Sequence, residues 1–338
     1  MNTTRRAMAG FTLVELMIAL VLGLLVIAGV GSVFLANKDA YRTNEALAQV
    51  QDAARTSFEY LARDVRAAGV NFCGAARVDS VLNPGNGLLN LASVDDAIQG
   101  WSDIGDVPDT FGLPSSVPGK PVPGRPLIRV AGSRDAGLAL ADSTVARSQI
   151  ELGSGAAVNT GNVLMLCDTN KAVIFQVTGM SGSVIEHAAG ATGDDNAPGN
   201  DSTADTFLDD PTFAASSYLA VPTNYLWYVG ENDAGGHSLY RHGLGAQGIE
   251  TTEMVRGLKA DDAGDWDVRY HVRGEDGFVD AAGVGSNWGL VDAVRLTITT
   301  QSRGIDPGNS ARGAGTDRER LERTFTTTIA IRSRMDAS

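Results

Sequence analysis

The chain has 338 residues, and its 27 Lys and Arg against 40 Asp and Glu give a formal net charge of −13. This acidic balance disfavours binding of nucleic acid or of an anionic membrane surface by the globular part. Forty glycines and only 6% aromatic residues indicate many turns and loops. The composition therefore favours a β-rich domain with exposed loops over a compact enzyme core.

The N-terminal region combines a short basic leader with a long apolar segment. Residues 1–10 contain Arg5 and Arg6 and no acid, and Glu15 is the only charged residue between Phe11 and Leu35. A helix of this segment would be about 37 Å long, enough to cross a hydrocarbon core of about 30 Å. The arginines before the span predict a cytoplasmic N-terminus and translocation of everything beyond residue 35.

Two residues distinguish this segment from an ordinary signal or anchor. Gly10 precedes the apolar run, whereas the small residue at the cleavage site of a secretory signal follows it. An acid inside an apolar helix costs a few kcal/mol and usually has a partner. Glu15 either reaches polar head groups near the cytoplasmic interface, or it neutralises the new amine that a cut after Gly10 creates on Phe11 of a neighbouring subunit. Only the second alternative accounts for the Gly-Phe junction.

The helix should continue beyond the membrane. No proline occurs between Leu35 and Pro84, and Gly69 is a suitable C-terminal stop. We therefore expect a leader over 1–10, a transmembrane helix over 11–35 and an amphipathic stem helix over 36–69. Apolar residues at spacings of three and four define the buried stripe of the stem. They are Leu47, Val50, Ala54, Phe58, Leu61, Val65 and Ala68.

Residues 70–338 predict a β-rich globular head. Alternation is clearest in Val294–Thr300 and Phe325–Arg332, which indicates antiparallel strands with one solvent-exposed face. The expected fold class is α+β, with the long helix packed on an antiparallel sheet. The other expected strands are Leu127–Val130, Gln149–Leu152, Val163–Cys167, Ala172–Val177, Tyr225–Val229, Leu239–Arg241 and Trp266–Val272, and the expected loops are Asn83–Gly124, Gly190–Thr206 and Gly304–Arg320.

The stretch Gly10-Phe-Thr-Leu-Val-Glu15-Leu, followed by its apolar run, resembles the cleavage and methylation motif of type IV prepilins and type II secretion pseudopilins. The resemblance implies that a prepilin peptidase cuts between Gly10 and Phe11 and methylates the amine of Phe11. Glu15 then occupies the fifth mature position, where the acid of the family makes an assembly contact.

Later segments resemble the PilW-type minor pilins in order and spacing. They are Phe58–Gly69, Ser238–Arg241, Met254–Leu258, Asp267–Tyr270, Trp288–Arg295 and Phe325–Arg332. The resemblance implies a protein of type IV pilus assembly that primes the fibre and sits at its tip. The implied partners are other minor pilins, the major pilin and a tip adhesin. The implied location is the inner membrane, with the head in the periplasm, and later the extracellular pilus.

Two other functions stay open at this stage. A minor pseudopilin of a type II secretion system would have a similar stem, although the long head favours the pilus. A membrane-anchored enzyme or binding protein could share only the leader, but no catalytic pattern supports it, and we expect no enzymatic activity. The four histidines have no catalytic spacing such as HExxH.

Cys73 follows the stem helix and Cys167 ends an expected strand. The topology places both outside the cytoplasm, where thiols oxidise. A bridge between them would close a loop of about 95 residues and contribute at most about 4–5 kcal/mol in the chain-entropy model. The alternative is two unpaired buried thiols.

Three further patterns imitate ligand sites. Residues 243–248 have the GxGxxG spacing without a βαβ context, so we expect no cofactor. Residues 194–205 imitate parts of an EF-hand loop, but Pro198 takes a ligand position and Asp205 replaces the bidentate Glu. Asp261, Asp262, Asp265 and Asp267 form an acidic cluster that we expect to be a solvated loop. No metal site is expected at either place.

Overall fold

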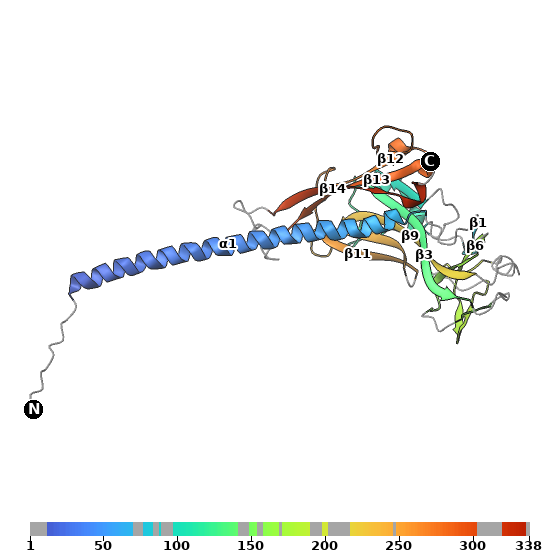
Figure 1. The fold of residues 1–338 in the computed structure, drawn as a ribbon, viewed down its shortest axis with the longest axis horizontal. Helices are drawn as coiled ribbons and strands as arrows, with labels where there is room; N and C mark the ends of the chain where they lie inside the picture. The colour runs from blue at the N-terminus through green and yellow to red at the C-terminus, as the bar shows by residue number, and fades with distance from the viewer. Residues whose placement is uncertain are drawn as a thin grey trace, which may run out of the picture. The chain divides into compact units, whose positions relative to one another are not determined.

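The computed structural model describes residues 12–69, 77–83, 88, 97–140, 149–153, 158–168, 171–189, 198–201, 217–245, 248–302 and 320–335. It confirms the α+β class, because one long N-terminal helix is followed by a large β-sheet (Figure 1). The chain divides into two compact units, Met1–Gln49 with Ser302–Leu321, and Val50–Gln301 with Glu322–Ser338.

Helix α1, Leu13–Arg66, is a single helix of 54 residues, which corresponds to about 80 Å. Its last turn contains two arginines, which suit the negative end of the helix dipole. The chain leaves the helix through Gly69, whose φ of 67° lies in the left-handed region that glycine adopts without strain. The predicted stripe is confirmed beyond Gln49: Val50, Ala54, Leu61, Val65 and Ala68 are buried, and Phe58 is half-buried.

The main sheet has eleven strands in the described part of the chain, and its central order is β1-β6-β5-β9-β10-β11-β13-β12. Strand β14 pairs with β13, and β2 pairs with β3, which in turn pairs with β9. The strands of this sheet are β1 Arg77–Ser80, β2 Ile98–Trp101, β3 Leu127–Ala139, β5 Val163–Cys167, β6 Lys171–Gln176, β9 Tyr218–Glu231, β10 His237–Gly245, β11 Gly248–Leu258, β12 Trp266–Val272, β13 Val291–Gln301 and β14 Glu322–Ala330.

A smaller sheet and several short helices complete the described elements. The small sheet has the order β4-β8-β7, with β4 Gln149–Glu151, β7 Gly179–Ser181 and β8 Val184–Glu186. The short helices are η3 Ile104–Asp106, η4 Asp109–Phe111, α3 Ala281–Val284, η5 Trp288–Leu290 and η6 Arg332–Arg334.

The sheet differs from the expectation in several respects. Strands β1 and β11 were not expected, and β3 and β10 extend beyond their predicted bounds. The sheet is mixed, because β1 and β6 are parallel while the other pairs are antiparallel. Strand β2 lies inside the segment that was expected to be the loop Asn83–Gly124. It was not recognised in the sequence because four residues are too few to show alternation. Strand β9 begins at Tyr218, before the predicted start at Tyr225. Proline in a sequence argues against a strand, yet Pro222 lies within the pairing of β9 with β3. The other two expected loops fall almost entirely outside the described residues.

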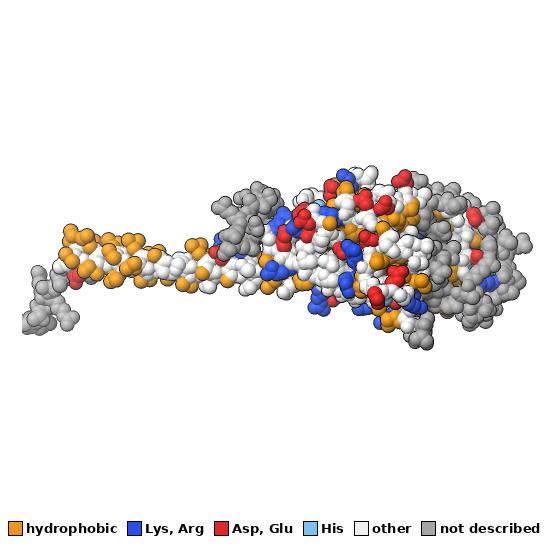
Figure 2. All heavy atoms as spheres, turned by 90° about the horizontal axis from the view of Figure 1, so that it is seen from above, with side chains coloured by type: hydrophobic (Ala, Val, Ile, Leu, Met, Phe, Trp, Pro, Cys, Tyr) orange, Lys and Arg blue, Asp and Glu red, His pale blue; other side chains and the backbone are white. Residues whose placement is uncertain are grey.

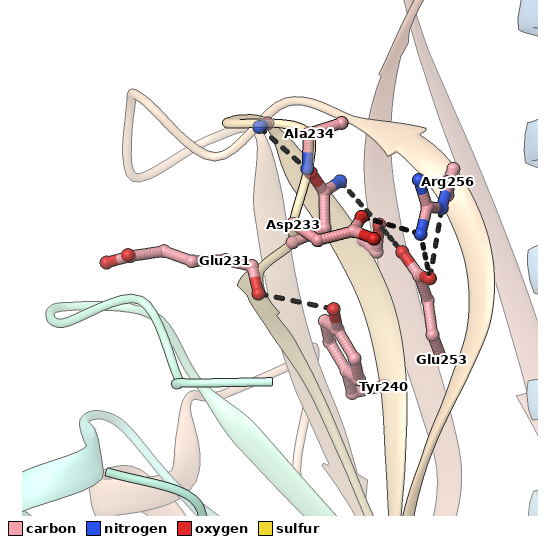
Figure 3. A network of polar contacts seen from close by, with 9 residues as sticks. Glu231, Asp233, Ala234, Tyr240, Glu253 and Arg256 are labelled. Atoms are coloured by element: carbon pink, nitrogen blue, oxygen red, sulfur yellow. Dashed lines mark hydrogen bonds and ion pairs between the residues drawn. The ribbon is translucent and has the colours of Figure 1, made fainter. Parts of the chain in front are cut away.

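Strands β9 and β10 form a hairpin whose turn is fixed by polar side chains (Figure 3). Asn232 Oδ1 accepts hydrogen bonds from the backbone of Ala234 and Gly236, and its Nδ2 donates to Ser238. The Ser238 hydroxyl in turn donates to Glu253 on β11. Arg256 lies 2.7 Å from both Glu253 and Asp233. These groups, of which Asn232 and Ser238 are buried, connect three neighbouring strands at one end of the sheet.

Candidate functional site

The start of α1 is closed by a reciprocal pair of side-chain hydrogen bonds. The backbone N–H of Glu15 donates to Thr12 Oγ1, and the backbone N–H of Thr12 donates to Glu15 Oε2, each over 3.2 Å. The Thr12 hydroxyl donates to the same carboxylate oxygen at 3.2 Å. This is a capping box, which satisfies two N–H groups that a helix N-terminus otherwise leaves without a partner. Glu15 therefore has a structural role in addition to its charge.

The first half of α1 presents an apolar surface on all sides. Figure 2 shows these side chains along the helix, and the large apolar residues from Leu13 to Leu35 are at least 55% exposed. Within the described residues, α1 is the one helix long and apolar enough to cross a membrane. Burial of this surface in lipid or among other apolar helices would remove it from water, and this transfer has a favourable free energy.

The second half of α1 is attached to the sheet by buried side chains and by polar contacts along its length. The Thr300 hydroxyl of β13 donates to the carbonyl of Val50 at 2.9 Å. The indole N–H of Trp227 on β9 donates to Asp64 Oδ2 at 3.2 Å. At the helix end the Ser333 hydroxyl donates to the carbonyl of Ala68 at 2.8 Å. The stem helix is thus held to strands β9 and β13 and to η6.

The end of α1 comes unusually close to strand β3. A Cβ placed on Gly132 would lie 2.7 Å from the carbonyl oxygen of Ala67, a separation that side chains do not tolerate. The backbone N–H of Gly69 donates to the carbonyl of Ala131 at 3.0 Å. The absence of a side chain at position 132 therefore allows the helix terminus to lie directly on the strand backbone.

Asp64 is the acid at this junction. Its side chain is 10% exposed, and Arg63 Nε lies 3.2 Å from Asp64 Oδ1. Burial is the largest influence and raises the pKa of Asp64 above its ordinary value, although Arg63, Arg241 and the Trp227 hydrogen bond oppose the shift. Both carboxylate oxygens of Asp64 thus have a hydrogen-bond partner, but these partners do not fully offset the cost of removing the charged group from water.

The predicted processing residues cannot be placed, since Gly10 and Phe11 lie outside the described residues, as does Cys73. Cys167 is fully buried and disulfide-bonded. Its pairing with Cys73 stays a prediction. Of the predicted site residues, the structure therefore locates Glu15, near the start of α1, and Cys167, at the end of β5.

The segments that imitate ligand sites have structural surroundings. The described residues of the GxGxxG pattern lie in the antiparallel strands β10 and β11, where a Cβ on Gly243 would meet the Asn224 carbonyl. The sequence suggested that the acidic cluster is a solvated loop, but this holds for only part of it. Asp261 and Asp262 are exposed as expected, whereas Asp265 is buried. The carboxylate of Asp265 accepts a hydrogen bond from the backbone of Asp262 and lies 4.0 Å from Lys259.

Among the described residues, no group of three or more His, Cys, Asp or Glu could hold a metal ion. Most of residues 194–205, the EF-hand-like segment, lies outside the described part. His242 is buried between Thr251 and the carbonyl of Phe111, and burial lowers its pKa. His271 contacts Asp292 at 2.7 Å on the partly exposed side of β12.

Sequence reasoning missed several residues that hold the helix. Thr12 carried a readable signal, since Thr-x-x-Glu before an apolar run is the pattern of a capping box. Thr300 and Ser333 had no such signal, because each contacts α1 across more than 200 residues of sequence. Gly132 is one of forty glycines, and nothing local distinguishes it.

Comparison with known proteins identifies one feature. Residues 5–31 match the family model of the prokaryotic N-terminal methylation motif. No curated protein and no solved structure matches the chain. The motif marks a type IV pilin-like prepilin, a class that is processed by prepilin peptidase and assembles with other pilins or pseudopilins. The apolar helix near the N-terminus fits membrane anchoring of such a prepilin.

Proposed function

We propose that this chain is a minor pilin of the PilW type, which takes part in assembly and priming of a type IV pilus and in its tip complex. The observation that carries the proposal is the methylation motif over residues 5–31, most of which lies in the exposed apolar part of α1. Such a helix suits both a bilayer and the helical core of a fibre, because each buries apolar surface. The PilW assignment is supported by the sequence segments that resemble that family.

In this proposal the peptidase cuts between Gly10 and Phe11 and methylates Phe11, while the protein spans the inner membrane with its head in the periplasm. Glu15 then pairs with the amine of Phe11 on a neighbouring subunit during assembly. Opposite charges attract strongly in an apolar surrounding, where water does not screen them. The role is structural and requires no catalytic residue. The partners are other minor pilins, the major pilin and a tip adhesin.

Substitutions at Glu15 separate its charge from its cap. Glu15→Gln keeps the acceptor of the capping box and removes the charge, whereas Thr12→Val removes the cap and keeps the charge. If charge pairing drives assembly, Glu15→Gln should be cleaved normally but absent from sheared fibres, and Thr12→Val should be incorporated. Immunoblots of membrane and fibre fractions measure both. Normal incorporation of Glu15→Gln would remove the charge from the mechanism.

A second substitution tests the processing site. Gly10→Val should prevent cleavage, so that mass spectrometry finds the leader still attached, whereas the Glu15 variants should show the mature mass with a methylated Phe11. An unchanged mature mass in Gly10→Val would place the cut elsewhere.

Type II secretion pseudopilins also carry such a methylation motif. A minor pseudopilin of a type II secretion system is therefore the second candidate function. The genes beside the coding sequence distinguish the two. Small prepilins next to a large adhesin support the pilus, whereas a secretin within a general secretion cassette would favour the pseudopilin.

A further inference from the structure

Strand β14 forms an edge of the main sheet (Figure 1). It pairs with β13 through nine residue pairs in one antiparallel register, without a bulge. Among the described residues, no other strand pairs with β14, and no backbone group bonds to its opposite side. The outer edge of β14 is therefore a row of backbone N–H and C=O groups without a partner in the described part of the chain.

The register identifies the residues whose backbone faces outward. In an antiparallel pair, residues that bond the neighbouring strand through N–H and C=O alternate with residues whose backbone groups point away from it. The N–H of Ile331 donates to the carbonyl of Asp292, and the N–H of Ser302 donates to the carbonyl of Leu321. The odd-numbered residues of this strand therefore bond to β13. The residues with outward N–H and C=O groups are Glu322, Thr324, Thr326, Thr328 and Ala330.

The side chains of the outward-facing threonines already have partners on the exposed face of the sheet. The hydroxyl groups of Thr326 and Thr297 lie 3.1 Å apart. Those of Thr324 and Thr299 lie 2.8 Å apart. Such cross-strand pairs hold β14 against β13. The groups of β14 that lack a partner belong to the main chain, which favours a ligand that also presents a main chain.

This edge lacks the features that usually prevent strand pairing between molecules. Those features are proline, bulges and charged side chains along the strand. The stretch Thr324–Ala330 contains none of them, and six of its seven residues are β-branched or aromatic. The outer edge of β12, in contrast, is covered by Val279, which exchanges two backbone hydrogen bonds with Tyr270. The edge of β14 is thus suited to receive another strand.

We propose that the outer edge of β14 binds an extended segment of a neighbouring protein subunit, which adds one strand to the sheet. The segment is uncharged over about seven residues and has an acidic residue at each end. Main-chain hydrogen bonds supply the affinity in this mode of recognition, and side chains supply the specificity. The neighbouring subunit rests on the proposed function, whereas the chemistry of the edge does not.

The charges around the edge favour an acidic partner. Arg323 and Arg332 are exposed and lie on either side of the uncharged stretch. Glu322, the acid of this strand, is already paired with Lys259 at 3.0 Å. A second copy of the chain would bring the same arginines to the edge, and like charges oppose strand pairing. A segment with acids at its ends attracts both arginines instead.

The test uses the full-length protein in a non-ionic detergent and the fluorescent peptide Glu-Thr-Val-Thr-Val-Thr-Val-Thr-Glu. Fluorescence anisotropy should detect binding of this peptide. The same peptide with every amide nitrogen methylated should not bind, because methylation removes the N–H groups that the β14 carbonyls require. Methylation of every second nitrogen leaves one complete edge and should preserve binding. Absence of binding by the unmethylated peptide up to about 1 mM would overturn the proposal.

Two substitutions at one position separate the backbone from the side chain. Thr326→Pro removes an outward N–H, and proline is tolerated on an edge strand at such a position. It should weaken binding of the peptide at least about tenfold. Thr326→Val keeps the N–H and removes only the hydroxyl that contacts Thr297, so its affinity should match the wild type. Equal weakening by both variants would contradict strand addition.

A second peptide tests the charge of the partner. With lysine in place of both glutamates, the peptide should bind at least about threefold more weakly to the wild type. Arg323→Gln with Arg332→Gln should abolish this difference. Equal affinity of the wild type for both peptides would overturn the acidic partner. A dimer of the protein that the peptide dissociates in sedimentation velocity would assign the edge to a second copy.

Thermal denaturation of each variant checks its folding. If Thr326→Pro does not fold, the methylated peptides carry the test with the wild-type protein alone. No fibre is needed for these measurements. A failure of the pilin proposal shows as absence from fibres while the peptide still binds, whereas a failure of the edge shows as absence of peptide binding.

Discussion

Gly132 is the residue at which the C-terminal end of α1 comes closest to the sheet. A methyl group at this position would lie 2.7 Å from a backbone oxygen, which cannot turn away as a flexible side chain could. Gly132→Ala should therefore lower the free energy of unfolding by about 1–3 kcal/mol, the usual cost of overpacking. Gly264→Ala is the matched control, since nothing lies within 4 Å of its added carbon. Thermal denaturation compares the two, and equal midpoints would show that the helix end shifts freely.

Asp64 predicts a pH dependence with a definite sign. Because burial is the main cause that raises the pKa of this acid, the folded state holds the proton more tightly than the unfolded state does. Ionisation at pH values above the ordinary 3.8 therefore lowers the free energy of unfolding. Asp64→Asn, which keeps an acceptor for Trp227, should gain stability relative to the wild type as the pH rises from about 4 to 7.

The measurement for Asp64 is the melting temperature of both proteins across that pH range. If the wild-type protein gained stability relative to Asp64→Asn as the pH rises to neutral, the predicted sign of the pH dependence would be wrong. Asp64→Ala is the control for the hydrogen bond. Asp64→Ala leaves the Trp227 indole without its acceptor, so it should be less stable than Asp64→Asn at every pH, by about 1–3 kcal/mol.

At the same scale, sequence reasoning identified Glu15 because a charge in an apolar run is conspicuous. The hydrogen bonds of that residue with Thr12 were also within reach, since both partners lie in one helical turn. Gly132 and Thr300 were not, because their importance comes from backbone atoms far away in the sequence. Local patterns carry information about local partners only.

At the scale of elements, α1 is one helix with two different surroundings. The same substitution in each half should therefore have different consequences. Leu61 is fully buried against the sheet, so Leu61→Ala should lower the free energy of unfolding of the head by about 2–5 kcal/mol. Leu24 is 65% exposed, and Leu24→Ala should leave the melting temperature of the head unchanged. A similar loss in both variants would mean that the two halves unfold together.

The strands were predictable where their residues alternate in burial, as in β12, or form a continuous apolar run, as in β5, whose bounds were also predicted. Strand β12 has a strict alternation of buried and half-buried residues, and the prediction matched its bounds. Strands β1 and β2 have four residues each, which is too few for a period of two to be recognised. The pairing of β1 with β6, which are separated by about 90 residues, depends on packing that no local pattern encodes.

At the scale of the whole molecule, the proposed bridge between Cys73 and Cys167 would tie the region after the stem helix to β5. Alkylation of the unfolded protein without reductant should label neither thiol, and prior reduction should expose both. Electrophoretic mobility should change only after reduction. Complete labelling without reductant would contradict the bridge. If the bridge forms, reduction should lower the free energy of unfolding, by at most about 4–5 kcal/mol for a loop of this length.

The fold class and the methylation motif were predictable at this scale, whereas the topology was not. The order of apolar helix and β-rich head follows from composition and periodicity. The mixed sheet of the described residues joins strands from the beginning, middle and end of the head, such as β1, β9 and β13. Which strands become neighbours depends on side-chain packing across the sheet, and a single sequence does not display that.

The capping box at the start of α1 has a consequence for maturation. Both of its members, Thr12 and Glu15, lie on the C-terminal side of the proposed cut, so the capping box itself contains no residue of the leader. Removal of the leader therefore requires no refolding of the helix start. The peptidase would release a subunit that keeps this cap, and the same Glu15 carboxylate would then have to serve both the cap and the amine of a neighbouring Phe11.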